Sequence, residues 1–184
     1  MPYNCVVLVK QVPDTANIAG KAMKDDGTVN RAALPAIFNP EDLNALEMAL
    51  QVKEQYGGRV TVLTMGPPRA AEVLRESLFR GADDAVLLTD RQFAGSDTLA
   101  TSYALKCAVE RIGTYDLVLC GRQAIDGDTA QVGPQVAEKL GLPQITYADA
   151  LVSLDENRIV AERALPLGRE RVACTLPCLL TVVG

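Results

Sequence analysis

Residues 5–9, Cys5-Val6-Val7-Leu8-Val9, form an uninterrupted apolar run near the start of the chain. Such a run is typical of a short strand that is buried on both faces of a parallel sheet. Three similar runs follow at residues 60–64, 85–89 and 116–120, and longer segments with helical signals separate them. Strands that alternate with helices predict an α/β fold with a mostly parallel sheet and crossover helices.

Helix start and stop signals support this alternation. The segment Asn39-Pro40-Glu41-Asp42 predicts a helix start, because Asn caps, Pro suits the first helical position and two acids favour the positive end of the helix dipole. This helix is predicted to end near Tyr56, before two glycines. Three further helices are predicted. One spans residues 69–80, one begins after an N-cap at Ser96 and runs to residue 112, and one ends at residue 140.

The remaining segments predict turns, a hairpin and an antiparallel end. Pro13 predicts that strand pairing stops after the first strand, and residues 21–31 predict a small hairpin that turns at Asp25-Asp26-Gly27. The last predicted elements are strands without helices between them, at residues 158–163, 169–175 and 179–183. They predict an antiparallel hairpin and a strand that joins or flanks the sheet. Because the sequence contains no repeats and no segment with the composition of a linker, residues 1–184 are predicted to form a single domain.

The composition excludes several classes of function. The 18 Lys and Arg residues against 23 Asp and Glu give a net charge of −5, which disfavours nucleic acids and anionic membrane surfaces as partners. The absence of histidine excludes Ser-His-Asp and Cys-His catalysis and zinc sites that use an imidazole. No apolar run approaches the roughly 18 residues of a membrane-spanning helix, so a soluble, cytoplasmic protein is expected. The odd number of cysteines, mostly in apolar stretches, predicts reduced and buried thiols: Cys5, Cys107, Cys120, Cys174 and Cys178.

Four connecting segments are candidates for ligand binding, because each follows a strand of the predicted sheet. Ligands of open α/β sheets bind at the carboxyl ends of the strands, where loops and helix N-termini converge. The four segments are residues 10–15, 65–67, 90–98 and 121–133. We therefore expect them to surround one site.

Residues 121–133 have the composition of a phosphate-binding loop. Three glycines and small Ala and Thr residues precede a helix and leave backbone N–H groups free at the positive end of its dipole. Thr129 and Gln131 add side-chain donors. A plain strand-to-helix connection explains the same composition, and Asp126 and Asp128 oppose an anion unless they cap backbone groups or contact ribose hydroxyls. Neither a P-loop nor a GxGxxG segment after the first strand is present.

The other candidate residues give weaker signals. Residues 90–98 suit one face of a planar ring or a second phosphate, but a polar connection with Phe93 in the core explains them as well. Lys10 at a strand end suits an anion or a reduced flavin, and a solvated lysine is the alternative. Cys174 and Cys178 lack the further ligands that a metal site needs, so they are interpreted as structural thiols.

At these segments the sequence resembles the β subunit of electron transfer flavoproteins, over essentially all 184 residues. The resemblance implies a three-layer, doubly wound, mostly parallel α/β sheet of the adenine-nucleotide-binding type, related to universal stress proteins, with an antiparallel C-terminal addition. The matching stretches are Val9-Lys10-Gln11-Val12-Pro13-Asp14, Asn39-Pro40-Glu41-Asp42 followed by Ala45-Leu46-Glu47, Met65-Gly66-Pro67, Arg80-Gly81-Ala82-Asp83, and residues 121–133.

The resemblance also implies a nucleotide in the site. The family's β subunit holds AMP in simple electron carriers, or FAD in the bifurcating type that accepts electrons from NADH. Residues 90–102 and 126–133 resemble the bifurcating type, which favours FAD, with AMP as the alternative. A flavin carries its own redox chemistry, so the role needs no histidine. The implied cofactor-binding residues are Leu8, Lys10, Asn39, Pro40, Glu41, Asp42, Met65, Arg91, Asp97, Thr98, Gly121, Gln123, Ala124, Ile125, Asp126, Gly127, Asp128, Thr129, Ala130, Gln131 and Val132.

Within this implied site, Lys10 and Arg91 are expected to stabilise negative charge on a reduced ring, and the helix that opens near Thr129 is expected to hold the pyrophosphate. The implied function is that of an electron carrier subunit rather than a stand-alone enzyme. Its implied partners are an α subunit, in a heterodimer, and dehydrogenases or ferredoxin-like redox proteins. The family's β subunits continue into a C-terminal arm that embraces the α subunit, and this sequence, ending at Gly184, is expected to lack it.

Two other functions fit the same fold class. A regulatory module of the universal stress protein type is the alternative function, and it requires a Gly-rich ATP loop near the chain end that the sequence does not contain. Adenylate hydrolases and ligases require a Ser-Gly-Gly loop after the first strand, where this sequence has Lys10-Gln11-Val12-Pro13. Both therefore rank below the electron carrier.

Overall fold

The computed structural model describes residues 1–14 and 34–184, so the hairpin predicted at residues 21–31 lies outside the described residues. Eight strands form one sheet in the order β5-β4-β1-β6-β10-β7-β8-β9, and β2 and β3 form a separate sheet. The strands are β1 (Cys5–Leu8), β2 (Gln11–Pro13), β3 (Ala36–Phe38), β4 (Val60–Met65), β5 (Asp84–Leu88), β6 (Leu117–Gly121), β7 (Gln144–Asp155), β8 (Arg158–Leu165), β9 (Gly168–Thr175) and β10 (Cys178–Val182). The helices are α1 (Pro40–Tyr56), α2 (Ala71–Arg80), α3 (Thr98–Ile112) and α4 (Val132–Leu140), with one-turn 3₁₀ helices at Pro68–Ala70 and Arg91–Phe93.

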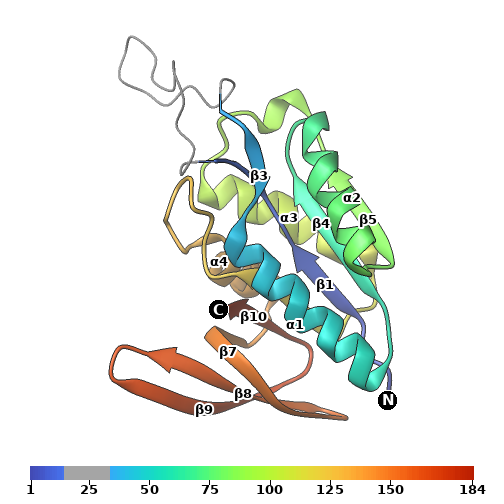
Figure 1. Ribbon diagram of the computed structural model, residues 1–184, viewed down its shortest axis with the longest axis vertical. Coiled ribbons are helices and arrows are strands. Elements are labelled where there is room, and N and C mark those ends of the chain that lie inside the picture. Colours follow the sequence, from blue (N-terminus) through green and yellow to red (C-terminus); the bar gives the residue numbers. More distant parts are fainter. Residues whose placement is uncertain (15–33) are drawn as a thin grey trace.

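Strand β1 lies inside the sheet, as its apolar sequence predicts. All four of its residues are buried, and it pairs in parallel with β4 on one side and with β6 on the other. Strand β10 inserts between β6 and β7 and is parallel to both. The chain therefore extends the sheet from β1 first towards β5 and afterwards in the opposite direction (Figure 1). The strand order reverses between β1 and β6, and doubly wound folds bind ligands at such a point.

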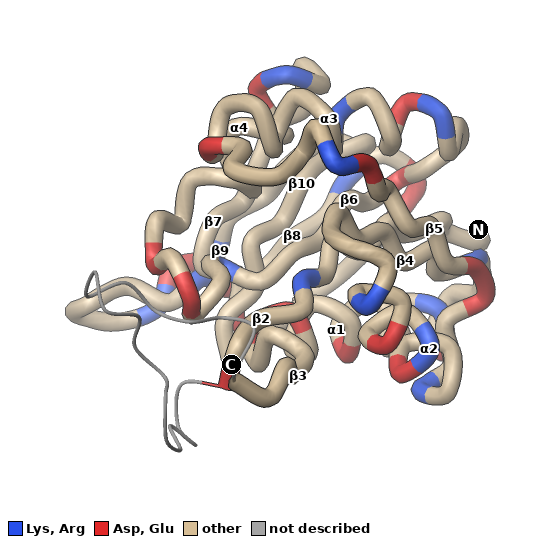
Figure 2. Tube along the Cα trace, turned by 90° about the horizontal axis from the view of Figure 1, so that it is seen from above, with Lys and Arg blue, Asp and Glu red and all other residues tan. Residues whose placement is uncertain are grey.

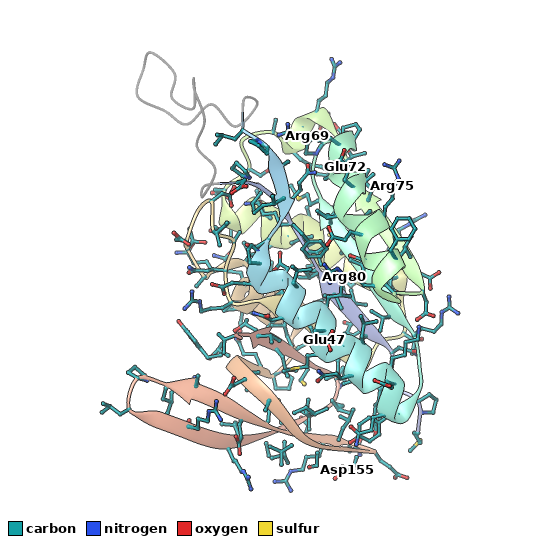
Figure 3. All side chains as sticks on the ribbon, viewed as in Figure 1. Glu47, Arg69, Glu72, Arg75, Arg80 and Asp155 are labelled. Carbon is teal, nitrogen blue, oxygen red and sulfur yellow. The ribbon has the colours of Figure 1, made fainter. Side chains whose placement is uncertain are left out.

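Helices cover both faces of the sheet, which confirms the three-layer, doubly wound fold. Helices α1 and α2 pack on one face, where Leu46 and Val7 belong to the same apolar core. Helices α3 and α4 pack on the other face, where Val109 and Val136 surround Val6. Figure 2 shows α3 and α4 on one side of the strands and α1 and α2 on the opposite side. The exposed surfaces of α1 and α2 carry charged side chains such as Glu47, Glu72 and Arg75 (Figure 3).

The end of the chain forms the predicted antiparallel addition, with one more strand than the sequence predicts. Strand β8 pairs in antiparallel fashion with both β7 and β9. Strand β7 spans 12 residues for which no strand is predicted. Its pairing with β8 shifts register between Ala148 and Ala150 and again between Leu151 and Ser153. These irregularities break the alternation of apolar and polar residues by which a strand is found in a sequence.

Two local predictions are wrong. Pro13 does not stop strand pairing, because it ends β2 and lies opposite Ala36 of β3. A strand with a partner on one side only tolerates a residue without an N–H group. The N-cap of α3 is Asp97 instead of Ser96, and the carboxylate of Asp97 accepts a hydrogen bond from the N–H of Ala100 at 2.8 Å. Ser and Asp are comparable caps, so the sequence does not distinguish these neighbours.

The cysteines are free thiols, and Cys5, Cys120 and Cys178 are buried as predicted. Cys174 is partly buried, and Cys107 is exposed, so the prediction of burial does not hold for Cys107. Cys107 follows the exposed Tyr103 by four residues on α3, and residues at this spacing share one face of a helix. None of the helices in the described part of the chain has the length and apolar character needed to cross a bilayer.

Candidate functional site

A cavity of about 1140 Å³ lies at the carboxyl end of the parallel sheet, beside the point where the strand order reverses. Residues from all four predicted segments line it, so the expected convergence is present in the structure. The segments reach the cavity because they follow β1, β4, β5 and β6, which are parallel neighbours. The predicted binding residues that line it are Leu8, Lys10, Asp42, Met65, Arg91, Asp97, Thr98, Gly121, Gln123, Ala124, Gly127, Asp128, Thr129, Ala130, Gln131 and Val132.

The loop from β6 to α4 presents a run of unpaired backbone donors to this cavity. Asp128 and Ala130 have φ angles of 49° and 52°, which are uncommon for residues with a side chain and indicate strain. Helix α4 begins at Val132, near the predicted opening, and its first turn continues the run. Among the described residues, the N–H groups of residues 129–133 donate to no acceptor. Five consecutive free donors at the positive end of a helix dipole suit an anion such as a phosphate.

Asn39 holds this loop without lining the cavity. Its side chain is fully buried and does not cap α1, contrary to the prediction from the sequence. Instead, its Nδ2 donates to the carbonyl oxygen of Gln123 at 2.9 Å, and its Oδ1 accepts from the N–H of Ile125 at 3.2 Å. We call Asn39 a loop clamp, because its side chain bonds to two residues of this loop. Capping a helix would use the same side-chain atoms, so the position of the neighbouring loop decides which of the two roles Asn39 takes. Asn39 therefore positions the loop and does not line the cavity.

Asp42 joins the ends of β1 and β6 through one carboxylate. Its Oδ2 accepts from the N–H of Lys10 and its Oδ1 from the N–H of Gly121, both at 2.9 Å. Burial raises the pKa of Asp42 to about 7, against the lowering effect of hydrogen bonds from Asn39, Gly121 and Lys10. The donors at the two strand ends are thus already occupied. An anion in the cavity has to use other donors, and residues 129–133 offer them.

Replacing Asp42 by asparagine is expected to remove a pH dependence of stability. A carboxyl whose native pKa is raised from 3.8 to about 7 stabilises the fold while it is protonated, and this contribution is lost as the pH rises through 7. Between about pH 5 and pH 8 the wild-type free energy of unfolding should fall by on the order of 2 kcal/mol relative to the Asp42→Asn variant. Urea unfolding of both proteins over this range measures the difference. Parallel pH profiles would contradict the assignment.

The charged side chains around the cavity are largely engaged by one another. The Nζ of Lys10 lies 2.6 Å from Oδ1 of Asp126, which links the first segment to the fourth. Asp128 accepts a hydrogen bond from Nε2 of Gln123 at 2.7 Å. Asp126 and Asp128, whose negative charges are expected to oppose an anion, therefore both interact with donors of the protein itself. The guanidinium of Arg91 has no hydrogen-bond or ion-pair partner among the described residues, so it is available to a ligand.

Arg122 also lines the cavity and is not among the predicted binding residues. Its Nη2 lies 2.7 Å from Oε1 of Glu41, and its guanidinium lies 5.9 Å from the ring centre of Tyr147. Tyr147 has a φ of 59°, a strained conformation for a bulky residue. Glu41 thus contacts Arg122 and does not reach the cavity itself. With Lys10 and Arg122 both paired, Arg91 supplies the uncompensated positive charge of the described cavity wall.

Helix α3 forms a wall that the residue-by-residue prediction largely missed. Thr98, Thr101 and Leu105 line the cavity, and their spacing places them on one face of the helix. This spacing is visible in the sequence and is the signal that could have identified Thr101 and Leu105. Phe93 also lines the cavity and is only partly buried. Of the two interpretations of residues 90–98, the one that places Phe93 in the core is therefore wrong.

Several predicted binding residues lie beside the cavity without lining it. Asn39, Glu41 and Asp126 contact other residues of the site, as described above. Ile125 offers its N–H to Asn39, and Pro40 is exposed in the first turn of α1. The described residues contain no group of three or more His, Cys, Asp or Glu side chains placed to hold a metal ion.

The order of the strands defines this molecule as a doubly wound α/β protein. The free N–H groups of the β6–α4 loop make the cavity at the carboxyl edge of its sheet suitable for an anion. The sequence of the electron transfer flavoprotein domain matches residues 26–184. The chain belongs to the electron transfer flavoprotein family, and its relatives include the β subunits of that family.

Three relatives illustrate the match. The electron transfer flavoprotein subunit beta of Thermoanaerobacterium thermosaccharolyticum is 51% identical over 180 residues, which cover 98% of this chain and 68% of that protein. The protein FixA of Sinorhizobium fredii is 52% identical, with 97% and 64% covered. The caffeyl-CoA reductase-Etf complex subunit CarD of Acetobacterium woodii is 48% identical, with 97% and 67% covered. The chain spans about two thirds of the length of these proteins, and the relationship supports a role in electron transfer.

Proposed function

We propose that the chain is the nucleotide-binding β subunit of an electron transfer flavoprotein and that its cavity binds FAD, with AMP as the alternative. The observation that carries this proposal is the run of free N–H groups at residues 129–133. Ala130 and Val132 of this run are partly buried and Gly133 is buried, whereas Thr129 and Gln131 are exposed to solvent. A buried or half-buried donor without a partner is unfavourable in a folded protein, and a bound phosphate accepts hydrogen bonds from several donors at once. The uncompensated charge of Arg91 on the same cavity favours an anionic ligand as well.

The size and walls of the cavity favour FAD over AMP. Its volume of about 1140 Å³ is above the range of roughly 300–1,000 Å³ for sites of drug-sized ligands, which leaves room for a dinucleotide. Apolar side chains suited to a planar ring line it: Leu8, Met65, Phe93 and Leu105. Bound FAD supplies one- and two-electron chemistry. The part of this chain is to bind and orient the nucleotide and to stabilise its negative charge through Arg91 and backbone N–H groups.

The proposed complex is a heterodimer of this chain with an α subunit. This heterodimer exchanges electrons with dehydrogenases or ferredoxin-like proteins. The names of two relatives, caffeyl-CoA reductase-Etf complex subunit CarD and acryloyl-CoA reductase electron transfer subunit gamma, describe those proteins as parts of larger redox assemblies. On α3 of this chain, Leu99 and Tyr103 are 59% and 62% exposed. Exposed apolar side chains at helical spacing favour contact with a partner chain.

The proposal is tested by identifying the ligand of the purified chain. A visible absorbance spectrum, followed by heat release and chromatography, is expected to show FAD, whereas a colourless protein that releases AMP would support the simple carrier. If the chain is purified without ligand, added FAD or AMP at about 100 times its Kd should stabilise the fold by about 2.7 kcal/mol in thermal unfolding. Absence of a bound nucleotide together with no stabilisation by either compound would contradict the proposed function.

Replacing Arg91 by glutamine is expected to weaken the binding of AMP and FAD roughly ten- to hundredfold, because the variant loses a charge-assisted contact worth roughly 1.5–3 kcal/mol. Titration calorimetry measures the change. Arg75→Gln is the matched control, since Arg75 is an exposed arginine on α2 that does not line the cavity. Equal affinities of the Arg91→Gln variant and the wild-type chain would exclude a role of Arg91 in binding.

A further inference from the structure

A chain of hydrogen bonds joins α3 to α4 beside the cavity. The hydroxyl of Ser102 donates to Oε1 of Gln135 at 2.9 Å, and Nε2 of Gln135 donates to Oγ1 of Thr98 at 3.3 Å. The hydroxyl of Thr98 donates in turn to Oε1 of Gln131 at 2.8 Å. Thr98 and Gln131 line the cavity, whereas Ser102 and Gln135 do not. The chain thus connects a fully buried serine to a side chain at the ligand site.

The direction of these bonds fixes the orientation of the Gln131 amide. A hydroxyl has one proton to donate, and a glutamine amide has an oxygen that accepts and an NH₂ group that donates. Because Ser102 donates to the oxygen of Gln135, the NH₂ group of Gln135 turns towards Thr98. Thr98 accepts from Gln135 and gives its own proton to the oxygen of Gln131. The Nε2 donor of Gln131 then has no acceptor among the described residues and remains available to a ligand.

The opposite order of donors would make the site unsuited to an anion. The Ser102 hydroxyl also lies 2.9 Å from the carbonyl oxygen of Leu99, so two acceptors compete for its proton. If the proton went to Leu99, Gln135 would turn its NH₂ group towards Ser102, Thr98 would donate to Gln135, and Gln131 would present its oxygen to the cavity. That oxygen would lie beside the free N–H groups of residues 129–133 and repel a phosphate. The order in the structure instead adds one more donor to this run.

We propose that Ser102 and Gln135 are positioning residues that hold the amide of Gln131 as a hydrogen-bond donor to the phosphate of the bound nucleotide. The inference rests on the proposed function, because it concerns the same cavity. Ser102 and Gln135 act through Thr98 and Gln131 and touch no ligand themselves. Their effect is therefore specific to the charged part of the ligand, whereas a purely structural role would affect all ligands alike.

The test compares AMP with adenosine, which lacks the phosphate. In the wild-type chain the ratio of the adenosine Kd to the AMP Kd measures the contribution of the phosphate. The Ser102→Ala and Gln135→Met variants are each expected to lower this ratio about tenfold in titration calorimetry and to leave the adenosine Kd unchanged, because a hydrogen bond to a charged group is lost. Ser77→Ala is the matched control, since Ser77 is a fully buried serine that donates to the carbonyl oxygen of Val73 on α2, away from the cavity.

A second measurement follows the Gln131 amide itself. In a ¹⁵N NMR titration of the wild-type chain, the side-chain NH₂ signal of Gln131 is expected to shift with AMP and not with adenosine, and the Ser102→Ala variant is expected to lose this shift. An unchanged Kd ratio in both variants, with lowered melting temperatures only, would overturn the inference and leave the proposed function standing. A wild-type chain that binds neither AMP nor FAD would overturn both.

Discussion

Replacing Gly121 by alanine is expected to destabilise the chain by about 3 kcal/mol and to abolish measurable nucleotide binding. A Cβ atom at this position would lie 2.6 Å from Oδ1 of Asp42 and 2.6 Å from the backbone carbon of Glu41. The second atom belongs to the backbone, and the first belongs to a buried carboxylate that is held by hydrogen bonds from Gly121 and Lys10. The methyl group must therefore separate β6 from the start of α1 and break the hydrogen bond from the N–H of Gly121 to Asp42. Chemical unfolding and calorimetry with AMP and FAD measure the two effects.

Gly127 provides the control for the Gly121 prediction. It belongs to the same loop and lines the same cavity, but a Cβ atom there would meet nothing within 4 Å. The Gly127→Ala variant is expected to keep its free energy of unfolding to within about 0.5 kcal/mol. If both variants were equally stable, the close approach of β6 to α1 would not be a constraint on this fold.

The Asn39→Asp variant is expected to lose about 3 kcal/mol of stability and roughly two orders of magnitude in nucleotide affinity. Asp equals Asn as a helix cap, and its charge favours a helix N-terminus, so the substitution would be harmless if Asn39 only capped α1. As a loop clamp, however, Asn39 must donate to the carbonyl oxygen of Gln123. A carboxylate cannot donate, and it would place a second buried negative charge beside Asp42. The loop of residues 121–133 would then lose its anchor.

Asn44→Asp is the matched control, because it adds the same charge to the same helix at a partly buried position. Thermal unfolding reports the stability of both variants, and titration with AMP reports the state of the loop. The clamp is refuted if Asn39→Asp and Asn44→Asp have the same stability and the same affinity.

Most of the fold could be predicted from the sequence, because its strands and helices are marked by local signals. The apolar run of β1 and the glycines after α1, α2 and α3 identify elements within one or two residues of their observed bounds. The exceptions follow from contacts between segments. Strand β7 escapes prediction because bulges interrupt its alternation, and Pro13 is accepted in β2 because that strand has a partner on one side only.

The candidate site could be predicted as a set of segments but not as a set of contacts. The rule that loops meet at the carboxyl edge of a parallel sheet correctly brings Lys10, Met65, Arg91 and Gln131 to one cavity. It gives no information on which side chains face the ligand and which face one another. Asn39 and Glu41 lie within three residues of Asp42 in the sequence, yet of these three only Asp42 lines the cavity.

The sequence by itself determined the order of most strands and helices, the carboxyl edge of the sheet as the place of the cavity, and the family, because these depend on residues that are neighbours along the chain. Only the tertiary structure decided the roles of the polar side chains. Asn39 clamps a loop instead of capping a helix, Lys10 pairs with Asp126, and Ser102 orients Gln131 through two intermediate side chains. Each of these side chains has several possible hydrogen-bond partners, and the folded chain selects one by bringing together groups that are far apart in sequence.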